Sequence, residues 1–478
     1  MKGKATKESS ASEAKGDARR RTRGGSTPSL SKKLRDRKDA GNNKQETPPK
    51  FAGVPRKNGR GSILHYIYQN ALGQSLPSQL RRCLQGPFVR LLSTYEFYNT
   101  VSPVDRRLTC LEWHPTQPST LAAASKGGDI YLGNTETPSK RSFIQGNGAG
   151  DSIGGMKFCP RDSSKVYVAS VEGTLTLQNF ESQRPIILSR TPDCGHEDHN
   201  VCYWYCCLDV SASRQMLVTG DNAGQLLLLS LDGHKVFSDK LHKTKVSHAE
   251  FNTRCDWLLA TASVDHTVKL WDLRNLKDKN SFLHDLPHEK AVNSAYFNPL
   301  DCSKLLTTDQ YDQIRVYSSP DWSKPQHIIQ HPHRQFQHLT PIKATWHPFY
   351  DLFVVGRYPD DRIFPGDERT IDIFDSNTAE LVCQIEDPTA AGIKSINKFN
   401  PLGDVIASGM GMSLLLWNRG KISQEEPLFS VKSYNRDLFR NLSRNRKGPA
   451  SDPKLKKKLA SLEESGTKTK KQAQMRKK

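Results

Sequence analysis

Hydrophobic and polar residues alternate in short runs through the middle of the chain, and these runs end in a recurring way. Five runs end on an aromatic residue followed by one further residue and a proline, as in Trp113-His114-Pro115 and Phe297-Asn298-Pro299. Two weaker copies complete a set of seven anchor residues: Trp113, Phe158, Val210, Phe251, Phe297, Trp346 and Phe399, spaced 41 to 53 residues apart. This period is typical of WD repeats with loops of varying length.

Two further apolar or alternating runs follow each anchor, with a polar turn between them. The last runs read DIYLGN, TLTLQNF, QLLLLSL, TVKLWDL, QIRVYSS, TIDIFDS and SLLLWNR. Period-two runs joined by tight turns predict four-stranded blades, and radial closure leaves only short, protected sheet edges. The predicted fold is all-β, a seven-bladed WD-repeat β-propeller over residues 101–425 with its repeats between about Thr109 and Asn418.

The fourth repeat carries polar residues that resemble a catalytic triad. His242, Ser263, Asp265 and Trp271 occupy the positions at which WD repeats place a structural hydrogen-bond chain. A Ser two residues before an Asp in such a hairpin normally satisfies buried polar groups, and the sequence has no nucleophile elbow, Walker A loop or HExxH. We therefore expect a non-enzymatic protein without catalytic residues, metal or cofactor.

Residues 61–100 precede the first repeat and have helical periodicity. Ser62 can cap a first helix that ends at Gly73, and Pro77 can start a second one that is weakened at Gly86-Pro87. The apolar positions of the two helices include Ile63, Leu64, Ile67, Leu72, Leu80, Leu84, Phe88 and Leu91. A closed propeller does not need these helices, so they must cover either its flank or another protein.

The connection between the fifth and sixth repeats contains Arg334-Gln335-Phe336-Gln337-His338. Phe336 could wedge into a base stack while Gln337 and His338 reach the vacated hydrogen-bonding edges. The alternative is that Phe336 packs between blades and the histidine joins a structural network. These residues alone favour the structural alternative.

Loops expected at one opening of the ring carry cations. They are Arg106, Arg107, Lys126, Lys243, Lys245, Arg334, Arg357 and Arg369. Connections between blades and the turns after second strands emerge on the same face, so the sequence predicts a local basic patch able to bind phosphates. Scattered surface cations are the ordinary alternative.

The net charge of +20 belongs to the two ends of the chain. Residues 1–60 hold 18 Lys and Arg against 6 Asp and Glu, residues 431–478 hold 16 against 4, and residues 61–430 hold 36 against 40. We expect 1–60 and 426–478 to be disordered basic tails that serve nuclear import, attraction to phosphate or solubility. Ten cysteines without a CxxC pair, and the lack of a signal or membrane-spanning segment, favour buried free thiols in a reducing cytosol or nucleus.

Several motifs, taken in order, resemble one family, the WD-repeat small subunits of UV-damaged-DNA-binding proteins. The motifs are VDRR, SKGGDI, LDVSAS, DWLLATASVDHTVKLWDLR, LLTTDQ, HPHRQFQHLTPIKA, VVGRYPD and ERTIDIFD, and the resemblance covers about residues 61–420. It implies a finger of Phe336, Gln337 and His338 that enters from the minor groove where a damaged dinucleotide is flipped out. It also implies a lesion pocket lined by Trp204 and Tyr358, with phosphate contacts from Arg106, Lys126, Lys245, Arg334 and Arg369.

The resemblance further implies protein partners. The helices at 61–98 would bind the large multi-propeller adaptor of a cullin–RING ubiquitin ligase, helped by Arg274 of the box Trp271-Asp272-Leu273-Arg274, although Arg274 could simply pair with Asp272. The expected function is recognition of double-stranded DNA with photolesions, on chromatin in the nucleus, by a ligase substrate receptor. The alternatives are a histone- or peptide-binding receptor without direct DNA recognition and an RNA-associated propeller. The second and sixth repeats lack a WDxR box, and the resemblance assigns no role to the long basic C-terminal tail.

Overall fold

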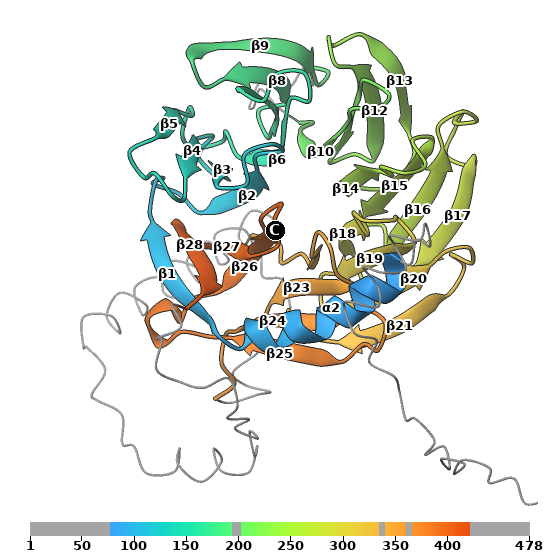
Figure 1. Ribbon diagram of the computed structural model, residues 1–478. Helices are drawn as coiled ribbons and strands as arrows, with labels where there is room; N and C mark the ends of the chain where they lie inside the picture. Colours follow the sequence, from blue (N-terminus) through green and yellow to red (C-terminus); the bar gives the residue numbers. More distant parts are fainter. Residues whose placement is uncertain (1–76, 194–201, 334–339, 360–365, 421–478) are drawn as a thin grey trace, which may run out of the picture. The chain divides into compact units, whose positions relative to one another are not determined.

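A computed structural model describes residues 77–193, 202–333, 340–359 and 366–420, all of which belong to the unit from Gly61 to Lys478. Within these ranges the strands form seven four-stranded antiparallel sheets placed around a central axis (Figure 1). The tails predicted at 1–60 and 426–478 lie outside the described residues.

Six blades follow the chain without interruption, from the inner to the outer strand. The first and second blades comprise β2 (Leu108–Trp113), β3 (Thr120–Ser125), β4 (Ile130–Asn134) and β5 (Arg141–Ile144), then β6 (Ile153–Phe158), β7 (Lys165–Ser170), β8 (Thr174–Asn179) and β9 (Ser182–Arg190). The third and fourth comprise β10 (Tyr205–Ser211), β11 (Met216–Asp221), β12 (Gln225–Ser230) and β13 (Lys235–Lys240), then β14 (Val246–Phe251), β15 (Leu258–Ser263), β16 (Thr267–Asp272) and β17 (Phe282–Pro287). The fifth and sixth comprise β18 (Val292–Phe297), β19 (Lys304–Asp309), β20 (Gln313–Ser318) and β21 (Pro325–Gln330), then β22 (Thr345–Trp346), β23 (Leu352–Gly356), β24 (Ile371–Asp375) and β25 (Leu381–Ile385).

The inner strands confirm the repeat predicted from the anchors. Six of the seven inner strands end on their anchor residue, and β10 ends one residue beyond Val210. The third strand of every blade coincides with one of the runs from DIYLGN to SLLLWNR. The seven-bladed WD-repeat propeller is therefore confirmed.

The seventh blade closes the ring with two distant parts of the chain. Its first three strands are β26 (Lys394–Phe399), β27 (Val405–Met410) and β28 (Ser413–Arg419). The fourth and outermost strand is β1 (Tyr95–Val101), which pairs antiparallel with β28. The pairing runs from Tyr95 opposite Arg419 to Val101 opposite Leu414. The expectation of a helical segment up to residue 100 is therefore corrected, because the propeller begins at Tyr95.

The core lies between successive blades. In one cluster Val218 and Leu226 of the third blade pack against Val246, Leu259 and the fully buried Trp271 of the fourth. Equivalent clusters join the other neighbouring blades, and the last of them includes Trp417. Each sheet thus buries both of its faces, which explains why strands such as β3 and β15 are buried at every position.

The helix α2 (Pro77–Leu92) starts at the proline predicted to begin it and continues through Pro87. It lies across the blade that contains β24 and β25 (Figure 1). Phe88 contacts the rings of His347 and Tyr350 at centroid distances of 4.7 and 4.8 Å, and Leu92 is buried. This helix therefore packs on the propeller flank, one of the two possibilities that the sequence left open.

Smaller features complete the described structure. A 3₁₀ helix, η1, spans Pro388–Ala390. No helix of the described ranges is long and apolar enough to cross a bilayer. The nine described cysteines are free thiols; Cys255 is exposed, so not all of them are buried as the sequence predicted.

Candidate nucleic-acid interface

Blade connections and the turns between second and third strands carry four of the five predicted phosphate-binding cations. Arg106 lies in the β1–β2 loop, Lys126 in the β3–β4 turn, Lys245 in the β13–β14 connection and Arg369 just before β24. Blade connections and the turns between second and third strands emerge on one face of a propeller, so the topology gathers these four residues on the same face. Arg334 lies outside the described residues.

Arg106 and Lys126 belong to two loops that pack together. The backbone N–H of Lys126 donates to the carbonyl of Arg107 at 2.9 Å. A Cβ placed on Gly127 would come within 3.1 Å of Arg106 Cδ, so a larger residue at 127 would push the arginine away. Both cationic side chains are exposed. The first blade thus presents two neighbouring cations to solvent, as phosphate binding requires.

Trp204 and Tyr358, the predicted lesion-pocket residues, are held in different ways. The Trp204 backbone is fixed by Asn222, which accepts its N–H at 3.0 Å and donates to its carbonyl at 3.1 Å. Tyr358 donates its N–H to the Pro332 carbonyl at 2.8 Å, and the Arg369 guanidinium lies 5.4 Å from its ring centroid. Trp204 lines the central channel, whereas Tyr358 is not among the residues of that lining. The described structure does not bring the two rings together in one pocket.

The predicted finger, Phe336, Gln337 and His338, lies outside the described residues, but the chain immediately before it is fixed by two buried histidines. Nδ1 of His331 lies 3.1 Å from Nδ1 of His333. His331 Nε2 is 3.3 Å from a carboxylate oxygen of Asp372, and His333 Nε2 is 3.2 Å from the Asp309 carbonyl. Burial lowers the pKa of His331 to about 4, so this ring is neutral near pH 7.

The sequence motifs predict no role for this histidine pair. Its signal was present in His331-Pro332-His333 at the entry to the connection, where two rings separated by one residue can lie on the same side of an extended chain. The pair fixes His333, the last described residue before the predicted finger.

The hydrogen-bond chain of the fourth blade uses a residue that the sequence pattern did not select. His242 Nδ1 pairs with Asp265 at 3.0 Å, but its Nε2 contacts the hydroxyl of Thr261 at 2.7 Å. Trp271 Nε1 donates to the same hydroxyl at 2.8 Å. Ser263 instead donates to the Lys245 carbonyl at 2.9 Å. The expected link through Ser263 is corrected to Thr261, and no nucleophile–base pair is formed by Ser263 and His242.

The central channel is lined by one residue from each inner strand at the position before the anchor. We call this set the first tier: Glu112, Lys157, Asp209, Glu250, Tyr296, Thr345 and Lys398. A second tier lies two residues earlier on each strand: Cys110, Gly155, Cys207, His248, Ser294, Lys343 and Ile396. The channel space that these tiers surround has a volume of ≈ 310 Å³.

Charges in the first tier neutralise one another. Lys398 Nζ lies 2.7 Å from Glu112, and Lys157 lies 3.5 Å from Glu112 and 3.3 Å from Asp209. Although burial opposes ionisation, the two lysines hold the pKa of Glu112 below its ordinary value. Burial and the adjacent Asp209 carboxylate raise the pKa of Glu250 to about 8. The tier is thus an internal ion network in which one carboxyl is protonated at neutral pH.

The predicted adaptor-binding residues divide into separate environments. Phe88 packs on the propeller, Leu80 and Leu84 are partly buried, and Leu91 is exposed. Arg274 donates two hydrogen bonds to Asp272, at 2.9 and 2.8 Å, and stacks 4.2 Å from the Trp257 ring centroid. The pairing with Asp272 that the sequence allowed is therefore present, and the Arg274 side chain remains 56% exposed. Ile63, Leu64, Ile67 and Leu72 lie outside the described residues.

Comparisons with known proteins agree with this architecture. A family model described as WD domain, G-beta repeat matches residues 225–272, from β12 to β16. A protein of Gallus gallus named DNA damage-binding protein 2 is 59% identical over 420 residues, which cover 86% of this chain and 83% of the relative. A protein of the same name from Danio rerio is 56% identical over 427 residues, covering 87% and 85%, and one from Bos taurus is 48% identical over 360 residues, covering 75% and 83%.

Proposed function

Because the chain belongs to the family of DNA damage-binding protein 2, we propose that it is a non-catalytic nuclear sensor that binds damaged duplex DNA. The lesions are flipped-out pyrimidine photoproducts, and Phe336, Gln337 and His338 fill the gap that each leaves in the duplex. Flipping is least costly where pairing and stacking are already weakened, so affinity would report damage without reading sequence.

One observation supports this proposal, namely that four predicted phosphate-binding cations lie in loops of the face where blade connections emerge, while the predicted finger belongs in the sequence to the connection between β21 and β22. Arg106 and Lys126 lie on the first blade, and the finger segment follows His333 between the fifth and sixth blades. Lys245 and Arg369 approach the same face from the fourth and sixth blades. This arrangement can hold phosphates on both sides of a probing side chain, with Trp204 and Tyr358 contacting the extruded bases.

The test replaces Phe336, Gln337 and His338 with alanine in the full-length chain. A gel-shift assay at fixed salt compares irradiated with intact duplex, and Lys324→Ala in the exposed β20–β21 turn is the control. We expect the triple variant to lose its preference for irradiated DNA while retaining salt-sensitive binding to intact DNA. Unchanged discrimination would refute the finger assignment. In a competition assay, irradiated and intact duplex compete with a histone peptide for binding to the protein. Equal displacement of the peptide by the two duplexes would favour the peptide-binding alternative.

We further propose that the chain is a substrate receptor of a cullin–RING ubiquitin ligase on chromatin, bound through the large multi-propeller adaptor. Because β1 closes the propeller and Phe88 of α2 packs on it, the informative deletion is residues 61–76, which leaves both elements in place. We expect this deletion to abolish copurification of the adaptor while sparing DNA binding. Retained copurification would exclude Ile63, Leu64, Ile67 and Leu72 as the contact.

A further inference from the structure

The two tiers of the central channel differ in how completely their polar groups are used. In the first tier the carboxylates also cap neighbouring strands, since Asp209 accepts the Phe251 N–H at 2.8 Å and Glu250 accepts the Phe297 N–H at 2.6 Å. The hydroxyl of Thr345 donates to the Asn397 carbonyl at 2.6 Å. These groups have partners within the protein and leave little capacity for a ligand.

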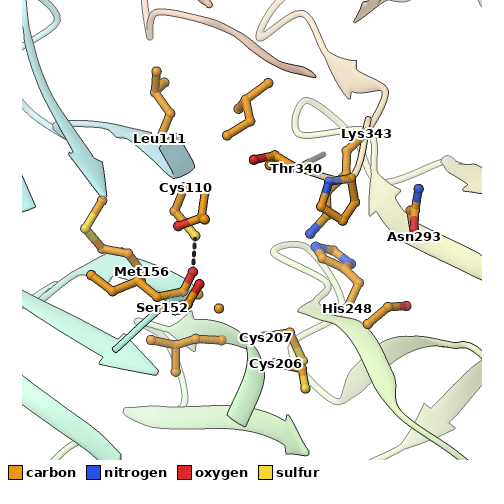
Figure 2. A pocket seen from close by; sticks show the side chains of 18 of the residues that line it. Cys110, Leu111, Ser152, Met156, Cys206, Cys207, His248, Asn293, Thr340 and Lys343 are labelled. Carbon is orange, nitrogen blue, oxygen red and sulfur yellow. Dashed lines mark hydrogen bonds between the residues drawn. The ribbon is translucent and has the colours of Figure 1, made fainter. Parts of the chain in front are cut away.

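Among the described second-tier residues, the buried Ser294 hydroxyl lacks a partner, and so do two donors that line the channel, on His248 and Lys343. His248 Nδ1 accepts the Ala295 N–H at 3.3 Å, and burial, followed by the nearby Lys343, lowers the pKa of His248 well below its ordinary value. A neutral ring that accepts at Nδ1 carries its proton on Nε2. No hydrogen bond or ion pair between described residues involves this Nε2–H or the Lys343 ammonium. Figure 2 shows both side chains pointing into the same space, with Cys110 across from them and with Cys206 and Cys207 below His248 in this view.

Thr340 and Asn293, two other polar residues at this level, are already hydrogen-bonded to the backbone. Thr340 donates to the Leu108 carbonyl at 2.6 Å, and Asn293 donates to the carbonyls of Asp309 and Ile342 at 3.3 and 3.2 Å. Burial raises the pKa of the Cys207 thiol to about 12 and also raises that of Cys110, so neither thiol supplies a negative charge at neutral pH. The space beside Lys343 and His248 therefore offers donors but no counter-charge.

The charge of the whole lining points the same way. Lysine and arginine contribute Arg107, Lys157, Lys245, Lys343 and Lys398. The first tier contributes the carboxyl groups of Glu112, Asp209 and Glu250, of which Glu250 is protonated at neutral pH, so five cations face two carboxylates. A volume of ≈ 310 Å³ is within the range of small-ligand sites, roughly 300–1,000 Å³. A doubly charged anion gains twice as much as a singly charged one from the same potential, and several acceptor oxygens suit an ammonium and an imidazole N–H together.

We propose that Lys343 and His248 form a binding site for a small phosphate-type dianion inside the central channel. The ammonium of Lys343 supplies the charge, and His248 Nε2–H supplies a directed hydrogen bond. Lys245, at the start of the fourth blade's inner strand, lies at the entrance from the cationic face and favours entry of anions. This site is independent of the proposed recognition of damaged DNA.

Calorimetric titration of the full-length protein with inorganic phosphate at constant ionic strength tests the site. Three variants are compared: Lys343→Met, Lys343→Arg and, as a matched surface control, Lys324→Met. Direct binding is measured because phosphate stabilises many proteins by exclusion from their surface, without any site. We expect one saturable site in the wild type and in Lys324→Met, roughly tenfold or more weaker binding in Lys343→Met, and recovery in Lys343→Arg.

Two results would overturn the proposal. One is a titration in which the wild type shows no saturable binding or binds no more tightly than a correctly folded Lys343→Met protein. The other comes from a parallel titration with short intact duplex: equal losses of phosphate and duplex affinity in Lys343→Met would assign the site to DNA phosphates. Loss of phosphate binding with duplex affinity retained supports a site for a free small anion.

Discussion

Phe88 and Leu91 are neighbours on α2 with the same predicted role, and the structure separates them. The Phe88 ring packs among His347, Tyr350 and Phe399, at centroid distances of 4.7, 4.8 and 6.4 Å. Leu91 is 37% exposed. If α2 is part of the propeller through Phe88, then Phe88→Ala should destabilise the fold and Leu91→Ala should not.

The expected magnitude follows from burial. Truncating a fully buried Phe to Ala costs about 3–5 kcal/mol, and Phe88 is partly buried, so we expect a loss of about 2 kcal/mol. In a protein of this size that corresponds to a decrease in Tm of roughly 4 °C. For Leu91→Ala we expect a change within about 0.5 kcal/mol.

Thermal unfolding followed by circular dichroism measures both variants, and copurification of the adaptor is measured on the same preparations. The structural role of Phe88 predicts that Phe88→Ala lowers Tm and that Leu91→Ala does not. An unchanged Tm in Phe88→Ala, combined with loss of the adaptor, would refute the reasoning and make Phe88 an intermolecular contact.

Two further predictions concern buried polar groups. Thr261→Val removes the shared hydrogen-bond partner of His242 and Trp271, so we expect the free energy of unfolding, measured with denaturant, to fall by about 2 kcal/mol. Thr261→Ser keeps the hydroxyl and should stay close to wild type. Equal stability of the Val and Ser variants would contradict a stabilising role for this hydroxyl. Glu250 has a pKa raised from 4.5 to about 8, so its folded-state stabilisation is complete below 4.5 and is lost as pH rises through about 8. Glu250→Gln should therefore match the wild type below about pH 4.5 and exceed its stability by a growing margin from there up to about pH 8. An identical pH dependence of the two proteins would show that Glu250 does not carry this titration.

The propeller could be predicted from the sequence because its determinants are local and repeated. Each anchor marks the end of an inner strand, and the alternating runs after it give the other strands of the blade. The closing strand β1 was missed for the opposite reason. Its alternating burial is visible in Tyr95–Val101, but its partner β28 lies more than three hundred residues away along the chain, and a helical pattern immediately precedes it.

The candidate site was predictable in its topology and not in its detail. The sequence could place Arg106, Lys126 and Lys245 on one face, because strand connectivity alone determines which loops share a face. It could not identify Thr261 instead of Ser263, since both are hydroxyl residues on the same strand two positions apart. Nor could it establish whether Trp204 and Tyr358 share a pocket, which depends on side-chain positions in blades three and six.

The inner strand of every blade is also a sheet edge, and an exposed row of edge N–H and C=O groups favours unwanted pairing. This protein covers part of that edge with side chains from the preceding blade: Asp209 caps Phe251, Glu250 caps Phe297 and Thr345 binds the Asn397 carbonyl. First-tier charges therefore have a structural explanation and are weak indicators of a ligand. At the second tier, by contrast, Thr340 and Asn293 already donate hydrogen bonds to backbone carbonyls. The ammonium of Lys343 makes no hydrogen bond that stabilises the backbone of the described residues. In a propeller channel, a charged or polar side chain indicates ligand binding only where it does not cap an inner strand. In this chain, among the described residues that line the channel, Lys343 and the Nε2–H of His248 meet that condition.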